Sequence, residues 1–267
     1  GQWYPWQEQP RGTVTLDISP DQFVTCLQNH DQVANSLRGL RMHQLASPAQ
    51  CRALTALLLL GPETPMLFQG QEFASSSPFF FFADHEAELS SQIFAGRKEF
   101  LYQFESLASG QADRYVADPS DEKTFLRSKL DPTERDKHAG WFWLHMDLIK
   151  LRKEDAVFGK PKVRSVDGAV LGDKIFLLRF FGEHGEDRLL IVNLGINMHL
   201  SAVPEPLYAP PEGCSWNPVW SSEDPRYGGA GLPEIKMEDD CHIPGHATVV
   251  FAAKPMEQTH GKTVPKD

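Results

Sequence analysis

The chain has 267 residues, of which 41% are hydrophobic and 23% are charged. This composition is typical of a folded globular protein and excludes a disordered one. With 26 Lys and Arg against 36 Asp and Glu, the formal net charge is −10, and this charge repels nucleic-acid phosphates and anionic lipid surfaces. We therefore expect neither nucleic acid nor a membrane as a partner.

The first 12 residues, GQWYPWQEQPRG, form an aromatic and turn-rich stretch. It begins with Gly rather than Met and contains no evident helix or strand, so we interpret it as the middle of a longer protein. The N-terminus also lacks a basic-then-apolar signal pattern. The longest apolar runs are far shorter than the roughly 18 to 20 residues that a membrane-spanning helix needs.

Two short apolar runs, residues 23–28 and 64–68, predict buried strands. Each run ends in polar residues, which are NHD at 29–31 after the first and QGQE at 69–72 after the second. The strands are too short and too apolar for a solvated sheet face, so we expect them to be covered on both sides, as in parallel sheets.

A helix is predicted between these strands. Ser47 is a good N-cap residue, and Pro48 suits the first helical position because its missing N–H has no partner there in any helix. The helix runs to Leu60, and Gly61 and Pro62 end it. A strand, a helix and a strand within about 45 residues indicate a βαβ unit with a right-handed crossover.

Farther along the chain, residues 87–104 predict a helix, residues 105–138 are polar and irregular, and residues 140–154 predict an amphipathic helix. After residue 160 the pattern changes to short strands separated by Gly, Pro, Asp and Asn. The predicted strands are 169–171, 175–181, 188–194, 216–220 and 248–252. Their spacing favours an antiparallel β-sandwich at residues 159–254, followed by a disordered tail at 255–267.

The four cysteines, Cys26, Cys51, Cys214 and Cys241, form no C-x-x-C pair, and no His cluster has metal-ligand spacing. We therefore predict free thiols in a reducing cytoplasm and no bound metal.

The polar strand ends are the candidate site. In βα folds the carboxyl ends of parallel strands lie at one mouth, so NHD and QGQE are expected to face the same pocket. Acids, amides and aromatic rings together suit a neutral sugar, whose hydroxyls need hydrogen bonds and whose C–H faces stack on rings. The alternative, in which a lone Asp or His at a strand end only caps a turn, stays open.

Several stretches together resemble the α-amylase family of glycoside hydrolases. They are WYPWQ, QNHDQVANS, TPMLFQGQEFASSSPFFFFADH, AGRKEF and WSSEDPRYGG, and the resemblance runs from residue 1 to about residue 253. It implies an α/β fold followed by an all-β domain: residues 1–158 would be the C-terminal part of a (β/α)8 TIM barrel, and residues 159–254 a small antiparallel β-sandwich domain.

The resemblance also implies roles for individual residues. Asp31 would be the carboxylate that stabilises the transition state by holding two hydroxyls of the reacting sugar, and His30 would hydrogen-bond the same sugar. The remaining candidates for substrate binding are Gln32, Glu72, Asp84, Trp3, Tyr4 and Trp6. The three aromatic residues could stack on sugar rings or could equally be core residues of a larger domain.

In this family the nucleophile and the general acid lie on earlier strands, so the resemblance implies that this chain lacks both. The implied substrate is maltooligosyltrehalose or a related α-glucan, from which the complete enzyme would release trehalose by retaining hydrolysis of an α-1,4 bond. The implied reaction needs no metal or organic cofactor. The missing N-terminal part of the same enzyme is then a required partner, and residues 1–267 alone are expected to be inactive. Two alternatives stay open: another member of the family, such as a glycogen-branching enzyme, and a non-catalytic glucan-binding module.

Overall fold

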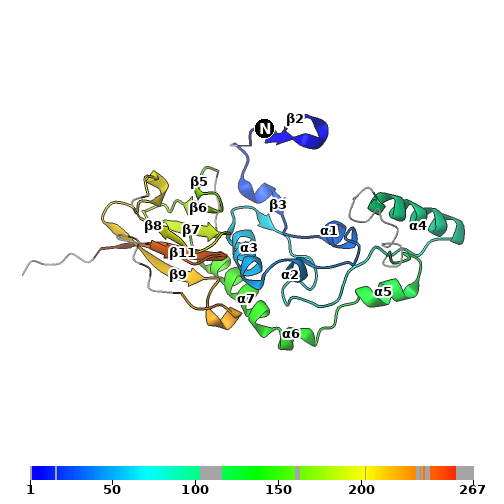
Figure 1. The fold of residues 1–267 in the computed structure, drawn as a ribbon. Coiled ribbons are helices and arrows are strands. Elements are labelled where there is room, and N and C mark those ends of the chain that lie inside the picture. The colour runs from blue at the N-terminus through cyan, green and yellow to red at the C-terminus, as the bar shows by residue number, and fades with distance from the viewer. Residues whose placement is uncertain are drawn as a thin grey trace, which may run out of the picture.

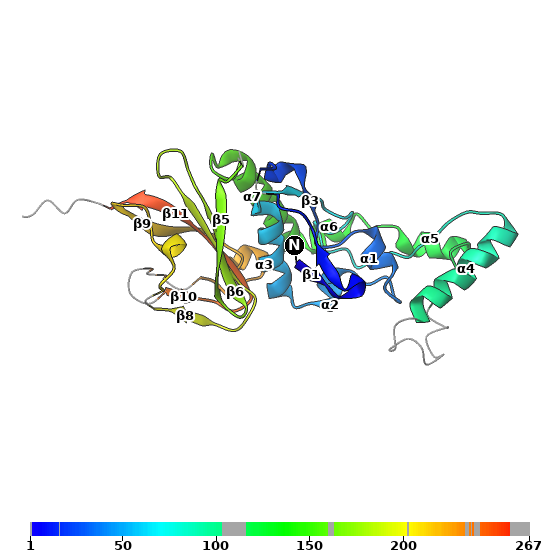
Figure 2. The ribbon, with the colours of Figure 1, turned by 90° about the horizontal axis from the view of Figure 1, so that it is seen from above.

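The computed structural model describes residues 2–15, 17–102, 116–159, 163–201, 203–232, 235, 237 and 241–256, apart from the side chains of Gln2 and Trp6. A sheet-rich region lies at one end of the molecule and helix α4 (Ala87–Tyr102) at the other. Helices α3 (Pro48–Leu60) and α7 (Ala139–Glu154) lie between them, as both views show (Figures 1 and 2). The tail predicted at 255–267 was wrong at Pro255, which is the last residue of a strand, and residues 257–267 lie outside the described residues, as do the predicted helical residues 103 and 104.

The N-terminal stretch forms a small hairpin, which the sequence did not predict. Strand β1 (Gln2–Tyr4) and strand β2 (Gln9–Arg11) pair antiparallel and are joined by the 3-10 turn η1 (Pro5–Gln7). Glu8 closes this turn with a positive φ of 49°. The hairpin stands apart from the rest of the ribbon, above α1 (His30–Ala34) and β3 (Val24–Thr25) in Figure 1.

The predicted parallel pair is present, but it is shorter and more exposed than expected. After the 3-10 turn η2 (Pro20–Gln22), β3 pairs in parallel with β4 (Thr64–Pro65), with Val24 opposite Thr64. The prediction that the first strand is covered on both faces was wrong, since Phe23 is 38% exposed and Val24 is 64% exposed. The reason is that, within the described ranges, β3 has β4 as its only strand partner.

Helix α3 begins and ends where the sequence predicts. The Ser47 hydroxyl accepts a hydrogen bond from the Gln50 N–H at 3.2 Å, and the Gln50 side chain accepts from the Ser47 N–H, which completes a capping box. Gly61 is the C-cap residue. Short helix α2 (Met42–Leu45) precedes α3, and most of the α3 side chains are buried.

The segment between α4 and α7 is more regular than predicted. Helix α5 (Glu122–Ser128) and helix α6 (Glu134–Lys137) lie within residues 116–138, so the prediction of an irregular stretch was wrong there, and residues 103–115 lie outside the described residues. The Asp121 carboxylate caps α5 by accepting from the Lys123 N–H at 2.9 Å. These helices were not predicted because both are short and largely exposed, so their sequences are polar and lack an apolar helical pattern.

Two antiparallel sheets make up the sheet-rich region. The five-stranded sheet has the order β5-β6-β7-β11-β9, and the two-stranded sheet pairs β10 with β8. The strands are β5 (Val166–Gly172), β6 (Ile175–Phe180), β7 (Arg188–Asn193), β8 (Met198–Leu200), β9 (Cys214–Ser221), β10 (Cys241–Ile243) and β11 (Ala247–Pro255). The 3-10 turn η4 (Pro206–Tyr208) precedes β9. The five predicted strands are confirmed, whereas three-residue β8 and β10 were too short to predict.

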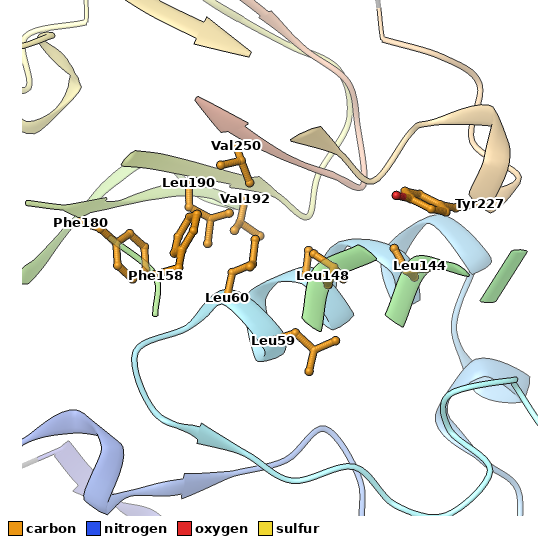
Figure 3. Close-up of a cluster of buried hydrophobic side chains, with 11 residues drawn as sticks. Leu59, Leu60, Leu144, Leu148, Phe158, Phe180, Leu190, Val192, Tyr227 and Val250 are labelled. Carbon is orange, nitrogen blue, oxygen red and sulfur yellow. The ribbon is translucent and has the colours of Figure 1, made fainter. Parts of the chain in front are cut away.

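Each face of the five-stranded sheet covers its own apolar core. On one face, residues from β8 and β10 pack over Leu177, Leu189 and Phe251. On the other face, residues of α3 and α7 pack against Leu190 and Val192, as Figure 3 shows. Every one of these five sheet residues is completely buried, so α3 and α7 join the sheet-rich region to the rest of the molecule through a continuous apolar core.

The stretch WSSEDPRYGG, residues 220–229, forms a docking loop on α3 and α7. Its Glu223 makes a buried ion pair with Arg52 of α3, with 2.6 Å between Nη2 and Oε1. The Tyr227 hydroxyl, in the 3-10 turn η5 (Pro225–Tyr227), donates to Asp147 of α7 at 2.6 Å. A Cβ at Gly229 would lie 2.3 Å from the Glu223 backbone, so only glycine fits there. The docking loop therefore adds specific polar contacts to the apolar joint.

All four cysteines are free thiols, as predicted. Within the described ranges, none of the helices combines the length and apolar character that crossing a bilayer requires.

Candidate functional site

Helix α1 holds the NHD residues, and its first turn is organised by a capping box. The Asn29 side chain accepts from the backbone N–H groups of Asp31 at 2.8 Å and Gln32 at 3.4 Å. In return, the Gln32 side-chain oxygen accepts from the Asn29 N–H at 2.9 Å. The structural capping role, which the sequence left open for Asp or His, thus belongs to Asn29, and the Gln32 side-chain oxygen is engaged in the same cap.

His30 and Asp31 follow this cap and extend toward solvent. Their side chains are 67% and 68% exposed, and His30 Nε2 lies 3.3 Å from Asp31 Oδ1. The Asp31 backbone is fixed at both ends, because its N–H donates to the Asn29 side chain and its carbonyl accepts from the Asn35 N–H at 2.9 Å. An exposed carboxylate and an exposed imidazole on a fixed turn are available to a ligand.

The structure brings the loops that follow β3 and β4 close together, while the shared pocket of NHD and QGQE stays a prediction. Gln28 directly precedes the N-cap residue Asn29. Its side-chain nitrogen lies 3.5 Å from the side-chain oxygen of Gln71, and both residues are buried. Gly70 makes the turn between the strand and Gln71 with a φ of +80°, where a Cβ would also lie 2.7 Å from Leu130. Glu72 follows Gln71 and is half-buried. The loops after β3 and β4 are therefore neighbours.

Arg41 joins the loops behind this site. It is fully buried, and it donates from Nε to the Ser77 carbonyl and from Nη1 to the Gln69 carbonyl, both at 2.7 Å. Its guanidinium carbon also lies 5.2 Å from the centre of the Phe68 ring. Burial lowers the pKa of Arg41, and the charges of Glu72 and Glu134 oppose that shift. Arg41 is thus a structural anchor for the loop after β4 rather than a sugar ligand.

A network of charged and hydroxyl groups surrounds Arg41. Glu134 of α6 accepts hydrogen bonds from the Ser76 N–H at 2.9 Å and from the Ser75 hydroxyl at 3.1 Å, and it also contacts the Ser76 hydroxyl. Burial acts to raise the pKa of Glu134, but these hydrogen bonds outweigh it and lower the pKa. Burial also lowers the pKa of His43 to about 4, and the nearby charges of Arg41 and His138 contribute to this shift. The network keeps Glu134 ionised and His43 neutral at pH 7.

The other predicted substrate residues lie at the edges of this region. Within the described ranges, no hydrogen bond joins Trp3, Tyr4 or Asp84 to α1. Trp3 is 60% exposed on the hairpin, and the ring of Tyr4 lies 4.6 Å from the Arg11 guanidinium carbon. Asp84 is exposed in the connection to α4. The Trp6 side chain lies outside what the structure describes, so the substrate role of all four residues stays a prediction.

Arg97 contacts the C-terminal end of α1, a contact that the sequence did not predict. From α4 it donates to the Asn35 side chain and to the Ala34 carbonyl, each at 2.8 Å. The sequence placed Arg97 in a later turn of a helix, but 62 residues separate it from Asn35, and nothing in its local pattern predicts which distant segment it contacts. Within the described ranges, no three His, Cys, Asp or Glu residues are grouped as a metal site would require.

A family model described as a domain of unknown function, DUF3459, matches residues 163–250, which cover most of the sheet-rich region. Among curated proteins, malto-oligosyltrehalose trehalohydrolase from Deinococcus radiodurans is 39% identical over 191 residues, or 71% of this chain. The enzyme of the same name from Arthrobacter ramosus is 39% identical over 158 residues.

This chain is a relative of the malto-oligosyltrehalose trehalohydrolases. It spans 31% of the length of the Deinococcus protein and 27% of the Arthrobacter protein. The resemblance found in the sequence motifs is thereby confirmed.

Two solved structures have a fold similar to that of this chain. A putative α-amylase from Salmonella typhimurium matches 95% of this chain and 39% of its own chain, with a TM-score of 0.73 and 24% identity. Isomaltulose synthase from Protaminobacter rubrum matches 86% of this chain with a TM-score of 0.50 and 12% identity. At these identities the likeness concerns the fold alone, and it extends over both the helical and the sheet-rich region.

Proposed function

We propose that this chain is the C-terminal part of a glycoside hydrolase that releases trehalose from maltooligosyltrehalose. The proposed reaction is retaining hydrolysis of the α-1,4 bond next to the terminal trehalose. The observation that carries the proposal is the 39% identity over 191 residues to a protein named for this activity. Residues 1–158 would then be the last strands and helices of a (β/α)8 barrel, and 159–254 a domain that packs on it.

In this proposal Asp31 stabilises the transition state and His30 binds the same sugar. The exposed Asp31 carboxylate, held on a capped turn, suits acceptance of hydrogen bonds from two sugar hydroxyls. Such bonds assist catalysis if they strengthen as the sugar ring distorts toward the transition state. Glu72 lies on the adjacent loop and is the next candidate for contact with the substrate.

The bond-breaking carboxylates are proposed to come from the rest of a longer enzyme. A retaining glycosidase needs a nucleophile and a general acid about 5 to 5.5 Å apart. The resemblance assigns neither role to a residue of this chain. Residues 1–267 alone are therefore expected to leave maltooligosyltrehalose intact, and no metal or organic cofactor is required by the proposed chemistry.

The test is product analysis with the longer enzyme. The wild type should release free trehalose from maltooligosyltrehalose, and Asp31→Asn should lower kcat by about 100- to 1,000-fold, because one transition-state contact is lost. The melting temperature should not change, since the Asp31 side chain is exposed. Asp173→Asn, in the exposed turn between β5 and β6, is the matched control and should leave kcat unchanged.

Other products would contradict the proposal. New α-1,6 branches in place of trehalose would indicate a branching enzyme. Glucan binding without any hydrolysis, unaffected by Asp31→Asn, would instead favour a binding module. Activity of purified residues 1–267 would show that the assignment of the nucleophile and the acid to a longer enzyme is wrong.

A further inference from the structure

We propose that Arg97 is a positioning residue, which holds helix α1 so that Asp31 presents its carboxylate correctly to the sugar. The inference rests on the proposed function, because it concerns the residue that is proposed to stabilise the transition state. Arg97 itself does not touch Asp31 and acts through the C-terminal end of α1.

A short chain of hydrogen bonds leads from Arg97 to Asp31. The Arg97 guanidinium donates from Nη1 to the Asn35 side-chain oxygen and from Nη2 to the Ala34 carbonyl, each at 2.8 Å. The Asn35 N–H in turn donates to the Asp31 carbonyl at 2.9 Å. Because α1 has only five residues, its two ends belong to nearly the same turn, and a shift at Asn35 moves Asp31 as well.

The charge of Arg97 also suits its place. The last carbonyls of a helix carry partial negative charge, and a cation beside them stabilises the helix end. The planar guanidinium can bind the backbone carbonyl and the amide oxygen at the same time, which a lysine ammonium at the same place would do less well. The ring of Phe81 lies 4.8 Å from the guanidinium carbon and covers one side of it.

Little of the described part of α4 is buried. Of the described residues of α4, Leu101 is the only one that is buried. Val33 and Ala34 of α1 are buried at 2% and 8% exposure, while His30 and Asp31 face solvent. A water-sized cavity of about 10 Å³ beside Arg97 is lined by Ala34 of α1, by Leu101 of α4 and by the segments 36–37, 80–81 and 116–117. Removing the guanidinium would enlarge this cavity and take away the two hydrogen bonds that hold the C-terminal end of α1 to α4.

The experiment compares Arg97→Ala with Lys98→Ala in the longer enzyme. Lys98 carries the same charge on the same helix, and its Nζ lies 4.5 Å from the ring of Phe94, also on α4. For Arg97→Ala we expect kcat to fall by about 10- to 100-fold, because a small displacement of a catalytic group is costly. KM should change by less than about threefold, since the contact that is lost acts mainly in the transition state.

Two further readouts separate positioning from a general structural role. Hydrogen exchange of residues 30–36 should become faster in Arg97→Ala and not in Lys98→Ala, while exchange in β7 stays unchanged. Added guanidinium ion should restore part of the kcat of Arg97→Ala and should have no such effect on Lys98→Ala. If Arg97→Ala does not fold, Arg97→Lys decides the question and should show the same direction with a smaller loss.

The outcomes distinguish this inference from the proposed function. A wild-type enzyme that releases no trehalose would overturn the proposed function and with it the role of Arg97. An active wild type, together with an Arg97→Ala variant (or, if that fails to fold, an Arg97→Lys variant) whose kcat and α1 exchange match those of Lys98→Ala, would overturn the inference alone.

Discussion

Strands β7 and β3 show that two regions of this molecule are held together in different ways. Strand β7 has a partner on each side and a core on each face, so that residues Leu189 to Val192 are all completely buried. Strand β3 pairs with β4, and its Val24 is 64% exposed. The sheet-rich region is thus stabilised by apolar burial on both faces, which is the largest favourable contribution to folding.

The region around the candidate site depends more on polar anchors. Arg41 donates a hydrogen bond to the loop after β4, and Arg97 donates to the C-terminal end of α1. The side chains of Gln28 and Gln71 contact each other between the two loops. Such contacts specify geometry well, but each adds only about 1 kcal/mol of net stability, or somewhat more when one partner is charged. The candidate site is therefore positioned by a few directional hydrogen bonds at the edge of a well-packed apolar core.

The largest effect is expected where the two regions meet. Glu223→Ala leaves Arg52 buried without its carboxylate partner, since the two side chains are only 9% and 7% exposed. The free energy of unfolding should fall by about 3 to 5 kcal/mol, which is typical of breaking a buried ion pair from one side. Urea unfolding of the purified protein measures this loss.

The control for Glu223→Ala is Glu154→Ala on α7. Glu154 pairs with Lys150 at 3.9 Å, but both side chains are more than two-thirds exposed. Its loss should be below about 0.5 kcal/mol. Equal effects of the two substitutions would mean that the docking loop does not hold the regions together.

The same change, Val to Ala, is expected to cost different amounts of stability in the two regions. Val192→Ala on β7 removes two methyl groups from a completely buried position and should cost about 2 to 3 kcal/mol. Val24→Ala on β3 should cost less than about 0.5 kcal/mol, because that side chain is 64% exposed. If Val24→Ala were as costly as Val192→Ala, β3 would be buried in solution and the contrast between the regions would not hold.

The smallest expected effect is the pH dependence of the free energy of unfolding that His43, near the candidate site, contributes. The pKa of His43 falls from 6.5 to about 4 on folding, mainly because of burial. Below pH 6.5 the unfolded chain binds a proton that the folded protein does not, so stability is fully present above pH 6.5 and declines as the pH falls toward 4. From pH 6.5 to 5.5 the contribution of His43 should be a loss of about 1 kcal/mol.

His43→Gln isolates this contribution, because the other titrating groups remain. Urea unfolding at both pH values should show a shallower pH dependence in the variant than in the wild type. The same slope in both proteins would show that His43 is protonated in the folded state.

Local sequence chemistry predicted several elements well. Ser47 and Pro48 at the start of α3, and Gly61 at its end, are local signals, and the structure places the helix boundaries there. The cap on α1 also had a readable signal that was missed, since Asn29 and Gln32 have the spacing of a capping box. The exposed face of β3 could not be predicted, because a short apolar run looks the same whether or not a neighbour covers it.

The sequence by itself determined the alternation of strand and helix before residue 68, the β-rich second half and the polar residues that follow the two parallel strands. These features depend on backbone preferences and on contacts within a few residues. Only the tertiary structure decided that Arg97 binds the end of α1 and that Glu223 binds Arg52, pairs separated by 62 and 171 residues. The physical reason is that the sequence predicts a solvent-exposed position for a charged side chain on a helix. Its burial becomes favourable only when folding brings a distant partner next to it.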